Sequence, residues 1–192
     1  ITAHAHELGM FVHLDGARIS NAAVSLGASF AEFTTDVGVD IVSLGGTKNG
    51  AMAAEAVVVL NPDLLAAVPF VRKTFMQLPS KMRFISAQLI ALFDGDLWHR
   101  NASISNARAQ RLATGLTAIE GVHISQPVQV NGVFAVLPAA VTERLQKEYP
   151  FYTWDHHTGE VRLMCSWDTT ESDIDAFVAA VAHEMATFVT GA

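Results

Sequence analysis

The chain has 192 residues, of which 51% are hydrophobic and only 16% are charged, a composition that excludes a disordered polypeptide. Its 12 Lys and Arg residues against 19 Asp and Glu residues give a net charge of -7 at pH 7, which argues against a nucleic-acid partner and against binding to an anionic membrane. The single cysteine, Cys165, excludes an intramolecular disulfide and a CxxC zinc site, and it favours a reducing compartment such as the cytoplasm.

Alternating strands and helices are predicted for the first half of the chain. Three short apolar runs predict strands, at residues 10–14, 40–44 and 54–60. The helical stretch between the first two runs is closed by Gly27, and this strand–helix–strand order favours a right-handed crossover and a parallel sheet. Because the runs are almost wholly apolar, we expect a sheet that is covered on both faces.

Helices are predicted to follow the third strand. Asn61 and Pro62 are a typical cap and first residue of a helix, which should run to about residue 73. Two more helices are expected, over residues 86–93 and 97–119. The helical spacing of three apolar residues puts them on one face of the last helix: Leu112, Leu116 and Ile119.

After Gly121 the sequence predicts a small α+β unit. We expect strands at residues 122–125, 132–137 and 161–165 around a helix at residues 139–148. Thr170, with Asp173 three positions later, approximates a capping box that begins the last helix. We therefore predict two domains, residues 1–95 and residues 96–192. No run of 18 apolar residues occurs, so no transmembrane helix is expected.

Two charged residues directly follow predicted strands. Asp15 ends the first strand, and Lys48 follows the second within a Gly-Gly-Thr-Lys-Asn-Gly segment. Ligands of open α/β sheets bind beyond the carboxyl ends of the strands, so the two side chains face one crevice if their strands are neighbours. Such a pair suits a pyridoxal phosphate enzyme, in which the lysine forms a Schiff base and the aspartate keeps the pyridine nitrogen protonated. An ion pair or two solvated loop ends is the alternative that spacing alone leaves open.

The motifs around these residues point to one family. The segment His-Leu-Asp-Gly-Ala-Arg at residues 13–18, followed by Ser-Leu-Gly-Gly-Thr-Lys-Asn-Gly at residues 43–50, resembles the low-specificity L-threonine aldolases, which are fold type I pyridoxal phosphate enzymes. The resemblance continues in the family's order through most of the chain. It implies an α/β fold in which residues 1–95 are the C-terminal part of a large, mostly parallel cofactor-binding domain. Residues 96–192 then hold a connecting helix and a small α+β domain.

The resemblance implies a role for five residues. Lys48 corresponds to the Schiff-base lysine, and Asp15 corresponds to the partner of the pyridine nitrogen. Arg18 corresponds to an arginine near the cofactor ring and the substrate. Arg162 corresponds to the arginine that binds the substrate carboxylate, a task that suits a bidentate guanidinium. Arg83 corresponds to an arginine that reaches the cofactor phosphate of a neighbouring subunit, with an exposed surface arginine as the alternative.

The implied reaction is the cleavage of L-threonine, L-allo-threonine and related β-hydroxy-α-amino acids to glycine and an aldehyde, in a homodimer or homotetramer with shared active sites. Another reaction of the same cofactor stays open as an alternative, such as that of a β-eliminating lyase, a serine hydroxymethyltransferase or an aminotransferase. An inactive fragment is a further alternative. The family has an N-terminal segment with a phosphate-binding loop and a ring-stacking histidine. The chain begins at Ile1 in what reads as the middle of a helix, so we expect that it lacks this segment.

The remaining polar candidates are interpreted as structural. His4, His6 and His13 lack the spacing of a metal-ligand set, and His183 is not followed by the second histidine of an HExxH motif, so no metal site is predicted. Cys165 lies in an apolar strand and is expected in the core. Four apolar residues of the region before the break at residue 94 are also expected in the core: Phe84, Leu89, Leu92 and Phe93.

Overall fold

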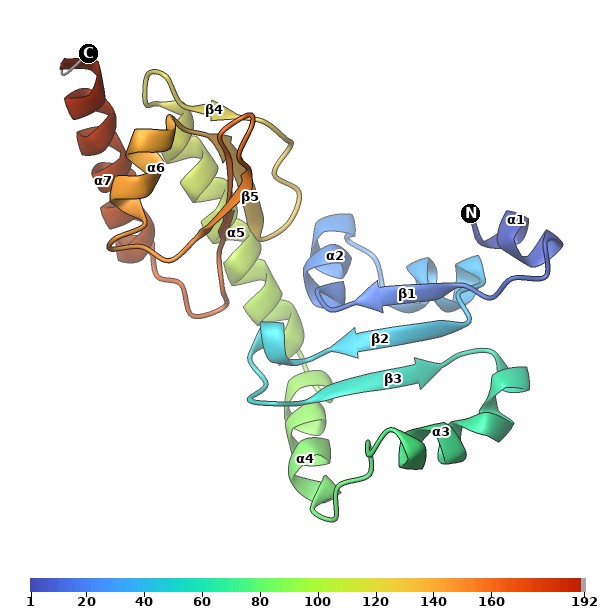
Figure 1. Cartoon of the computed structure of the whole chain (residues 1–192). Coiled ribbons are helices and arrows are strands. Elements are labelled where there is room, and N and C mark those ends of the chain that lie inside the picture. Colours follow the sequence, from blue (N-terminus) through green and yellow to red (C-terminus); the bar gives the residue numbers. More distant parts are fainter. Residues whose placement is uncertain (191–192) are drawn as a thin grey trace. The chain divides into compact units, whose positions relative to one another are not determined.

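The computed structural model describes residues 1–190 and divides the chain into two compact units, Ile1–Asn101 and Ala102–Ala192 (Figure 1). Each unit has its own sheet and its own hydrophobic core. Helix α5 (Leu97–Thr117) begins in the first unit and continues in the second. No helix within residues 1–190 is both long enough and apolar enough to cross a membrane.

The first unit contains a three-stranded sheet in the order β1-β2-β3, formed by β1 (His13–Gly16), β2 (Ile41–Gly45) and β3 (Glu55–Val59). The expected parallel pair is confirmed for β1 and β2, which α2 (Ile19–Leu26) connects. Strand β3 is antiparallel to β2, because the link between them is too short for a crossover that would return the chain in the same direction.

The two faces of this sheet differ. Leu14, Val42 and Val58 lie on one face, where they pack in a core with Ile19 of α2. The opposite face carries His13, Asp15 and Ser43, and Val57 on that side is 69% exposed. The expectation of a sheet covered on both faces is therefore wrong for the described part of this chain, since its one core lies on a single side of the sheet.

Short helices complete the first unit. Gly27 ends α2 in the left-handed conformation, with a φ of 62°, as predicted. Asn61 caps the next helix by accepting a hydrogen bond from the backbone N–H of Asp63, but the first turns are of the 3-10 type. The helical segments are α1 (Thr2–Glu7), η1 (Ala31–Phe33), η2 (Thr35–Val37), η3 (Thr47–Asn49), η4 (Pro62–Ala67), α3 (Val68–Thr74) and α4 (Met82–Phe93).

One buried carboxylate ties three segments of the first unit together. Asp40, just before β2, is 3% exposed. Its Oδ2 accepts hydrogen bonds from the backbone N–H of Val12 at 2.7 Å and bonds with Nε2 of His6 at 2.9 Å. Its Oδ1 accepts a hydrogen bond of 2.6 Å from the side chain of Asn61. These bonds, led by that from Val12, lower the pKa of Asp40 to about 2.

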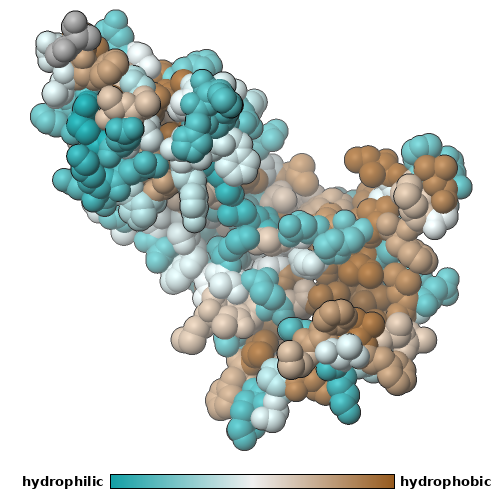
Figure 2. Space-filling model, in the orientation of Figure 1, coloured by the Kyte–Doolittle hydropathy of each residue, from teal (hydrophilic) through white to brown (hydrophobic). Residues whose placement is uncertain are grey.

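Much of the first unit's surface is apolar (Figure 2). Phe70, Phe75 and Met76 are 75%, 66% and 86% exposed. Phe84 is 61% exposed, so its expected place in the core is wrong; the start of α4 lies beyond the core around β2 and α2. Leu92 is buried as predicted, whereas Leu89 and Phe93 are half-buried.

The second unit is an antiparallel sheet in the order β4-β5-β7-β6. Its strands are β4 (His123–Ile124), β5 (Gly132–Val136), β6 (Tyr152–Asp155) and β7 (Glu160–Met164). Helices α5, α6 (Ala139–Leu145) and α7 (Glu171–Thr190) pack against one face (Figure 1). Leu112 and Leu116 are buried there and Ile119 packs beside them, which confirms the predicted apolar face of α5.

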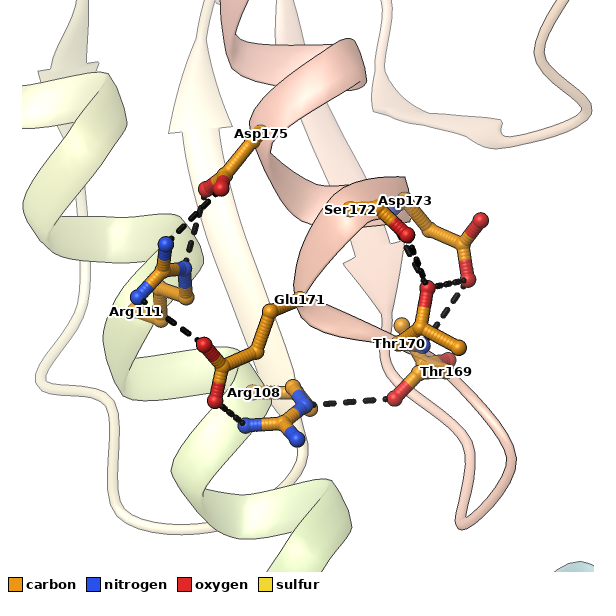
Figure 3. A network of polar contacts seen from close by, with 8 residues as sticks. All are labelled: Arg108, Arg111, Thr169, Thr170, Glu171, Ser172, Asp173 and Asp175. Atoms are coloured by element: carbon orange, nitrogen blue, oxygen red, sulfur yellow. Dashed lines mark hydrogen bonds and ion pairs between the residues drawn. The ribbon is translucent and has the colours of Figure 1, made fainter.

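A polar network joins α5 to the beginning of α7 (Figure 3). Arg111 forms a bidentate pair with Asp175, at 2.9 and 2.8 Å, and this ion pair lowers the pKa of Asp175. Arg108 donates a hydrogen bond of 2.8 Å to Glu171. The backbone N–H of Thr170 donates to Asp173, and that of Asp173 donates to Oγ1 of Thr170, so the predicted capping box is confirmed.

Candidate active site

Asp15 lies at the carboxyl end of β1, directly opposite Ser43 of β2. Its Oδ1 accepts a hydrogen bond of 3.0 Å from the backbone N–H of Ala17, which fixes the carboxylate at the start of the turn that follows the strand. The Asp15 side chain is exposed on the uncovered face of the sheet. The carboxylate is therefore held by its own backbone and remains accessible.

Lys48 lies in η3, the single turn that follows β2, and its side chain is exposed. Glu55 at the start of β3 holds the beginning of this turn, because its carboxylate accepts hydrogen bonds from the backbone N–H groups of Gly46 and Thr47, at 3.2 and 3.1 Å. Gly50 ends the turn with a φ of 110°, a backbone conformation that residues with a side chain rarely adopt. A rigid turn thus presents the lysine at the end of the strand.

The residue after Lys48 anchors the turn to the first unit's last helix. Asn49 is 4% exposed, and its side chain donates a hydrogen bond of 2.9 Å to the carbonyl of Trp98. The side chain of Asn101 in turn donates a bond of 2.8 Å to the carbonyl of Asn49. Lys48 therefore sits between two neighbours whose positions are fixed, Thr47 by Glu55 and Asn49 by the first turns of α5.

Two glycines allow the ends of β1 and β2 to approach closely. A Cβ atom on Gly45 would lie 2.5 Å from the carbonyl oxygen of Ala17, and one on Gly16 would lie 2.6 Å from that of Ser43. Because β1 and β2 are parallel neighbours, the segments that carry Asp15 and Lys48 leave the sheet at the same edge. The structure thus brings these two predicted residues to one edge.

The two other arginines of the first unit lie in different surroundings. Arg18 precedes α2 at its N-cap position and is half-buried, three residues beyond Asp15. Arg83 in the first turn of α4 is exposed, and its guanidinium carbon lies 4.9 Å from the ring centre of Phe84. That placement fits a surface arginine as well as one that reaches outward.

Arg162 belongs to the second unit, in the middle of β7. It lies on the sheet face opposite to the three helices, because its neighbours Val161 and Leu163 point into the core. Its guanidinium carbon lies 5.2 Å from the ring centre of Trp154. The side chain is half-buried.

One polar pair beside Asp15 was missed by the sequence reasoning. Nε2 of His13 and Oγ of Ser43 are 2.8 Å apart, and both residues lie on the same sheet face as Asp15. A histidine and a serine inside otherwise apolar strands were the available signal. Glu55 and Asn101 were also missed as supports of the Lys48 turn, since nothing in the sequence marks contacts across such separations.

The residues interpreted as structural lie as follows. Cys165 is buried in the second core as predicted, and burial raises the pKa of its thiol to about 11. His156 and His157 lie in the turn between β6 and β7, where the backbone N–H of His157 donates to Asp155. Within residues 1–190, no group of three or more His, Cys, Asp or Glu side chains is arranged to hold a metal ion.

Known proteins share both the sequence and the fold of this chain. It is 40% identical over 182 residues to a low specificity L-threonine aldolase of Pseudomonas sp., a match that covers 94% of this chain and 52% of that protein. A protein of the same name from Pseudomonas aeruginosa is 42% identical over 170 residues, which cover 88% of this chain and 49% of that protein. The chain therefore spans about half the length of the curated relatives that it matches, and the resemblance to these aldolases is confirmed.

The solved structures confirm the fold class. A threonine aldolase from Leishmania major superposes with a TM-score of 0.85 at 27% identity, over 96% of this chain and 54% of that one. A PLP-dependent aminotransferase from Streptococcus suis has a TM-score of 0.71 at 15% identity, over 97% of this chain and 51% of that one, and shares the fold alone. The family model described as beta-eliminating lyase matches residues 1–140. With most of its length matched by that model, the chain belongs to the beta-eliminating lyase family.

Proposed function

We propose that this chain carries the lysine and aspartate of a pyridoxal phosphate-dependent carbon–carbon lyase. Its substrates would be L-threonine, L-allo-threonine and related β-hydroxy-α-amino acids, which it would cleave to glycine and an aldehyde. The observation that carries the proposal is the arrangement of Asp15 and Lys48 at one edge of a parallel strand pair. The names of the relatives and of the solved neighbour supply the choice of reaction.

The residues at this edge fit the cofactor. An accessible amine on a rigid turn suits covalent attachment of an aldehyde, and an accessible carboxylate suits a protonated ring nitrogen. Gly45 lets the end of β2 lie directly against the segment that follows Asp15, because a Cβ atom there would be 2.5 Å from the carbonyl oxygen of Ala17. Pyridoxal phosphate, when bound, supplies an electron sink for the bond that breaks at the α-carbon of an amino acid.

Each proposed residue has a task that its own chemistry allows. Asp15 would hold a proton on the ring nitrogen, an attraction of about 4 kcal/mol for charges some 4 Å apart at an effective dielectric of 20. The Lys48 amine would bind the cofactor and give up its place to the substrate's amine. Arg18 would contact the ring and the substrate, and Arg162 would bind the substrate carboxylate by its paired N–H donors. Arg83 would reach the cofactor phosphate of a neighbouring subunit in a homodimer or homotetramer.

The proposal is tested by spectroscopy on the protein incubated with pyridoxal phosphate. We expect a visible absorption band that disappears on reduction with borohydride, which leaves the cofactor covalently attached to a peptide containing Lys48. We expect Lys48→Ala to lose both the band and the release of aldehyde from L-threonine. Lys73→Ala, which changes an exposed lysine elsewhere in the same unit, is the matched control. Full aldehyde release by Lys48→Ala would overturn the assignment.

The family's name describes β-elimination, so the same assay should include a substrate of that reaction. Incubation with L-threonine, L-allo-threonine and L-tryptophan, with aldehyde and indole measured, separates carbon–carbon cleavage from β-elimination. We expect aldehyde and no indole.

A further inference from the structure

The open face of the second sheet frames Arg162 with aromatic side chains. Arg162 lies in the inner strand β7, between Phe134 on β5 and Tyr152 on β6, which are its register partners. The ring of Trp154 lies 5.2 Å from the guanidinium carbon. Phe134 also contacts that indole edge to face, with 5.5 Å between ring centres and 76° between ring planes.

The guanidinium of Arg162 differs in its contacts from the other arginines of its unit. Arg108 and Arg111 form ion pairs with Glu171 and Asp175, and Arg144 pairs with Glu184. Within residues 1–190, no carboxylate lies within ion-pair distance of Arg162, although the side chain is half-buried. Its contact is instead a cation–π contact, which orients a guanidinium without occupying its N–H donors.

We propose that Trp154 is a positioning residue for Arg162. The indole, itself fixed by Phe134, restricts the guanidinium to one orientation and leaves its donors for a carboxylate ligand. The ligand is the α-carboxylate of an amino acid, and in this respect the inference rests on the proposed function. Preorganisation of this kind improves binding because less side-chain freedom is lost when the ligand arrives.

The test follows the Arg162 Nε–H signal of the ¹⁵N-labelled chain by NMR, assigned by its loss in Arg162→Lys, during titration with glycine. We expect glycine to move this signal in the unaltered protein. Trp154→Ala should weaken the apparent affinity for glycine about 2- to 5-fold, the range for an exposed cation–π contact. It should also shift the signal of the free protein, because the ring current of the indole is lost. Trp154→Phe, which keeps an aromatic ring, should restore most of the affinity.

Trp167→Ala is the matched control, since Trp167 is a half-exposed tryptophan of the same unit for which no contact with Arg162 is seen; it should leave the titration unchanged. An unchanged glycine affinity in Trp154→Ala, with backbone amide signals that show an intact fold, would overturn the inference, and so would a wild-type Arg162 signal that does not respond to glycine. In the cofactor-loaded enzyme, Trp154→Ala should raise KM by the same factor and leave kcat unchanged. Loss of the Lys48-dependent absorption band concerns the proposed function alone, so the two failures are distinguishable.

Discussion

At the scale of single residues, the close approach of two backbones makes Gly45 a position near Lys48 that does not tolerate a side chain. A Cβ atom there would overlap the carbonyl of Ala17 at 2.5 Å, and both partners are backbone that cannot rotate away. We expect Gly45→Ala to lower the free energy of unfolding by about 1–3 kcal/mol, the usual cost of overpacking. Urea denaturation followed by circular dichroism measures it. Gly95→Ala is the control, because nothing lies within 4 Å of a Cβ at Gly95, and a loss of equal size there would contradict the explanation.

Asp40 gives a prediction about pH. Its pKa falls from 3.8 to about 2 on folding, so the carboxylate stabilises the folded state above pH 3.8 and loses that contribution as the pH falls towards 2. Asp40→Asn should therefore lower the urea midpoint of unfolding at pH 6. The midpoint of this variant should also change less with pH between pH 4 and 2. Asp36→Asn, on an exposed neighbouring turn, serves for comparison. Identical pH profiles for Asp40→Asn and the unaltered protein would disprove the role of the buried network.

Among the candidate site residues, Asp15 and Lys48 could be predicted because glycines mark the turns where strands end. The supports of Lys48 could not. Glu55 reads as the start of a strand and Asn101 as part of a polar helix surface, and only the folded chain brings their side chains to the turn. Roles for Arg18, Arg83 and Arg162 came from resemblance, since an isolated arginine carries no local signal.

At the scale of elements, helix α7 depends on its first turn. Thr170 and Asp173 satisfy each other's backbone N–H groups, and a lost N-cap of this kind costs about 1 kcal/mol. We expect Thr170→Ala to destabilise the second unit by that amount in urea denaturation. Thr187→Ala, within the exposed part of the same helix, should be neutral or slightly stabilising because alanine has the higher helix propensity. Equal losses in both variants would show that the cap is not the cause.

Most elements could be predicted from apolar periodicity, and the exceptions have physical reasons. Strand β6 was missed because Tyr152 and Trp154 lie on the open face and the strand is defined by its pairing with β7, which local sequence does not reveal. Phe84 was placed in the core because a large aromatic side chain is usually buried, whereas here it lies beside Arg83 at the beginning of α4, a helix that starts earlier than predicted.

At the scale of the whole molecule, labelling of the single cysteine measures the unfolding of the second unit alone. Cys165 is 2% exposed, and burial raises the pKa of its thiol to about 11, so neither access nor ionisation favours alkylation in the folded state. We expect iodoacetamide at pH 8 to label Cys165 only under conditions that unfold the second unit. Mass spectrometry after timed labelling in increasing urea measures this. Rapid labelling without denaturant would contradict the buried position.

The hydrogen bonds of two asparagine side chains also affect how long the protein stays chemically intact. Asn49-Gly50 and Asn131-Gly132 are dipeptides of the kind that deamidate most readily, because the glycine nitrogen can attack the carbonyl carbon of the asparagine side chain. Here both side chains are buried and donate hydrogen bonds to backbone carbonyls, Asn49 to Trp98 and Asn131 to Cys165, which restrains the side-chain rotation that the attack requires. Folding therefore protects the two positions from ageing, including the one that neighbours the proposed catalytic lysine.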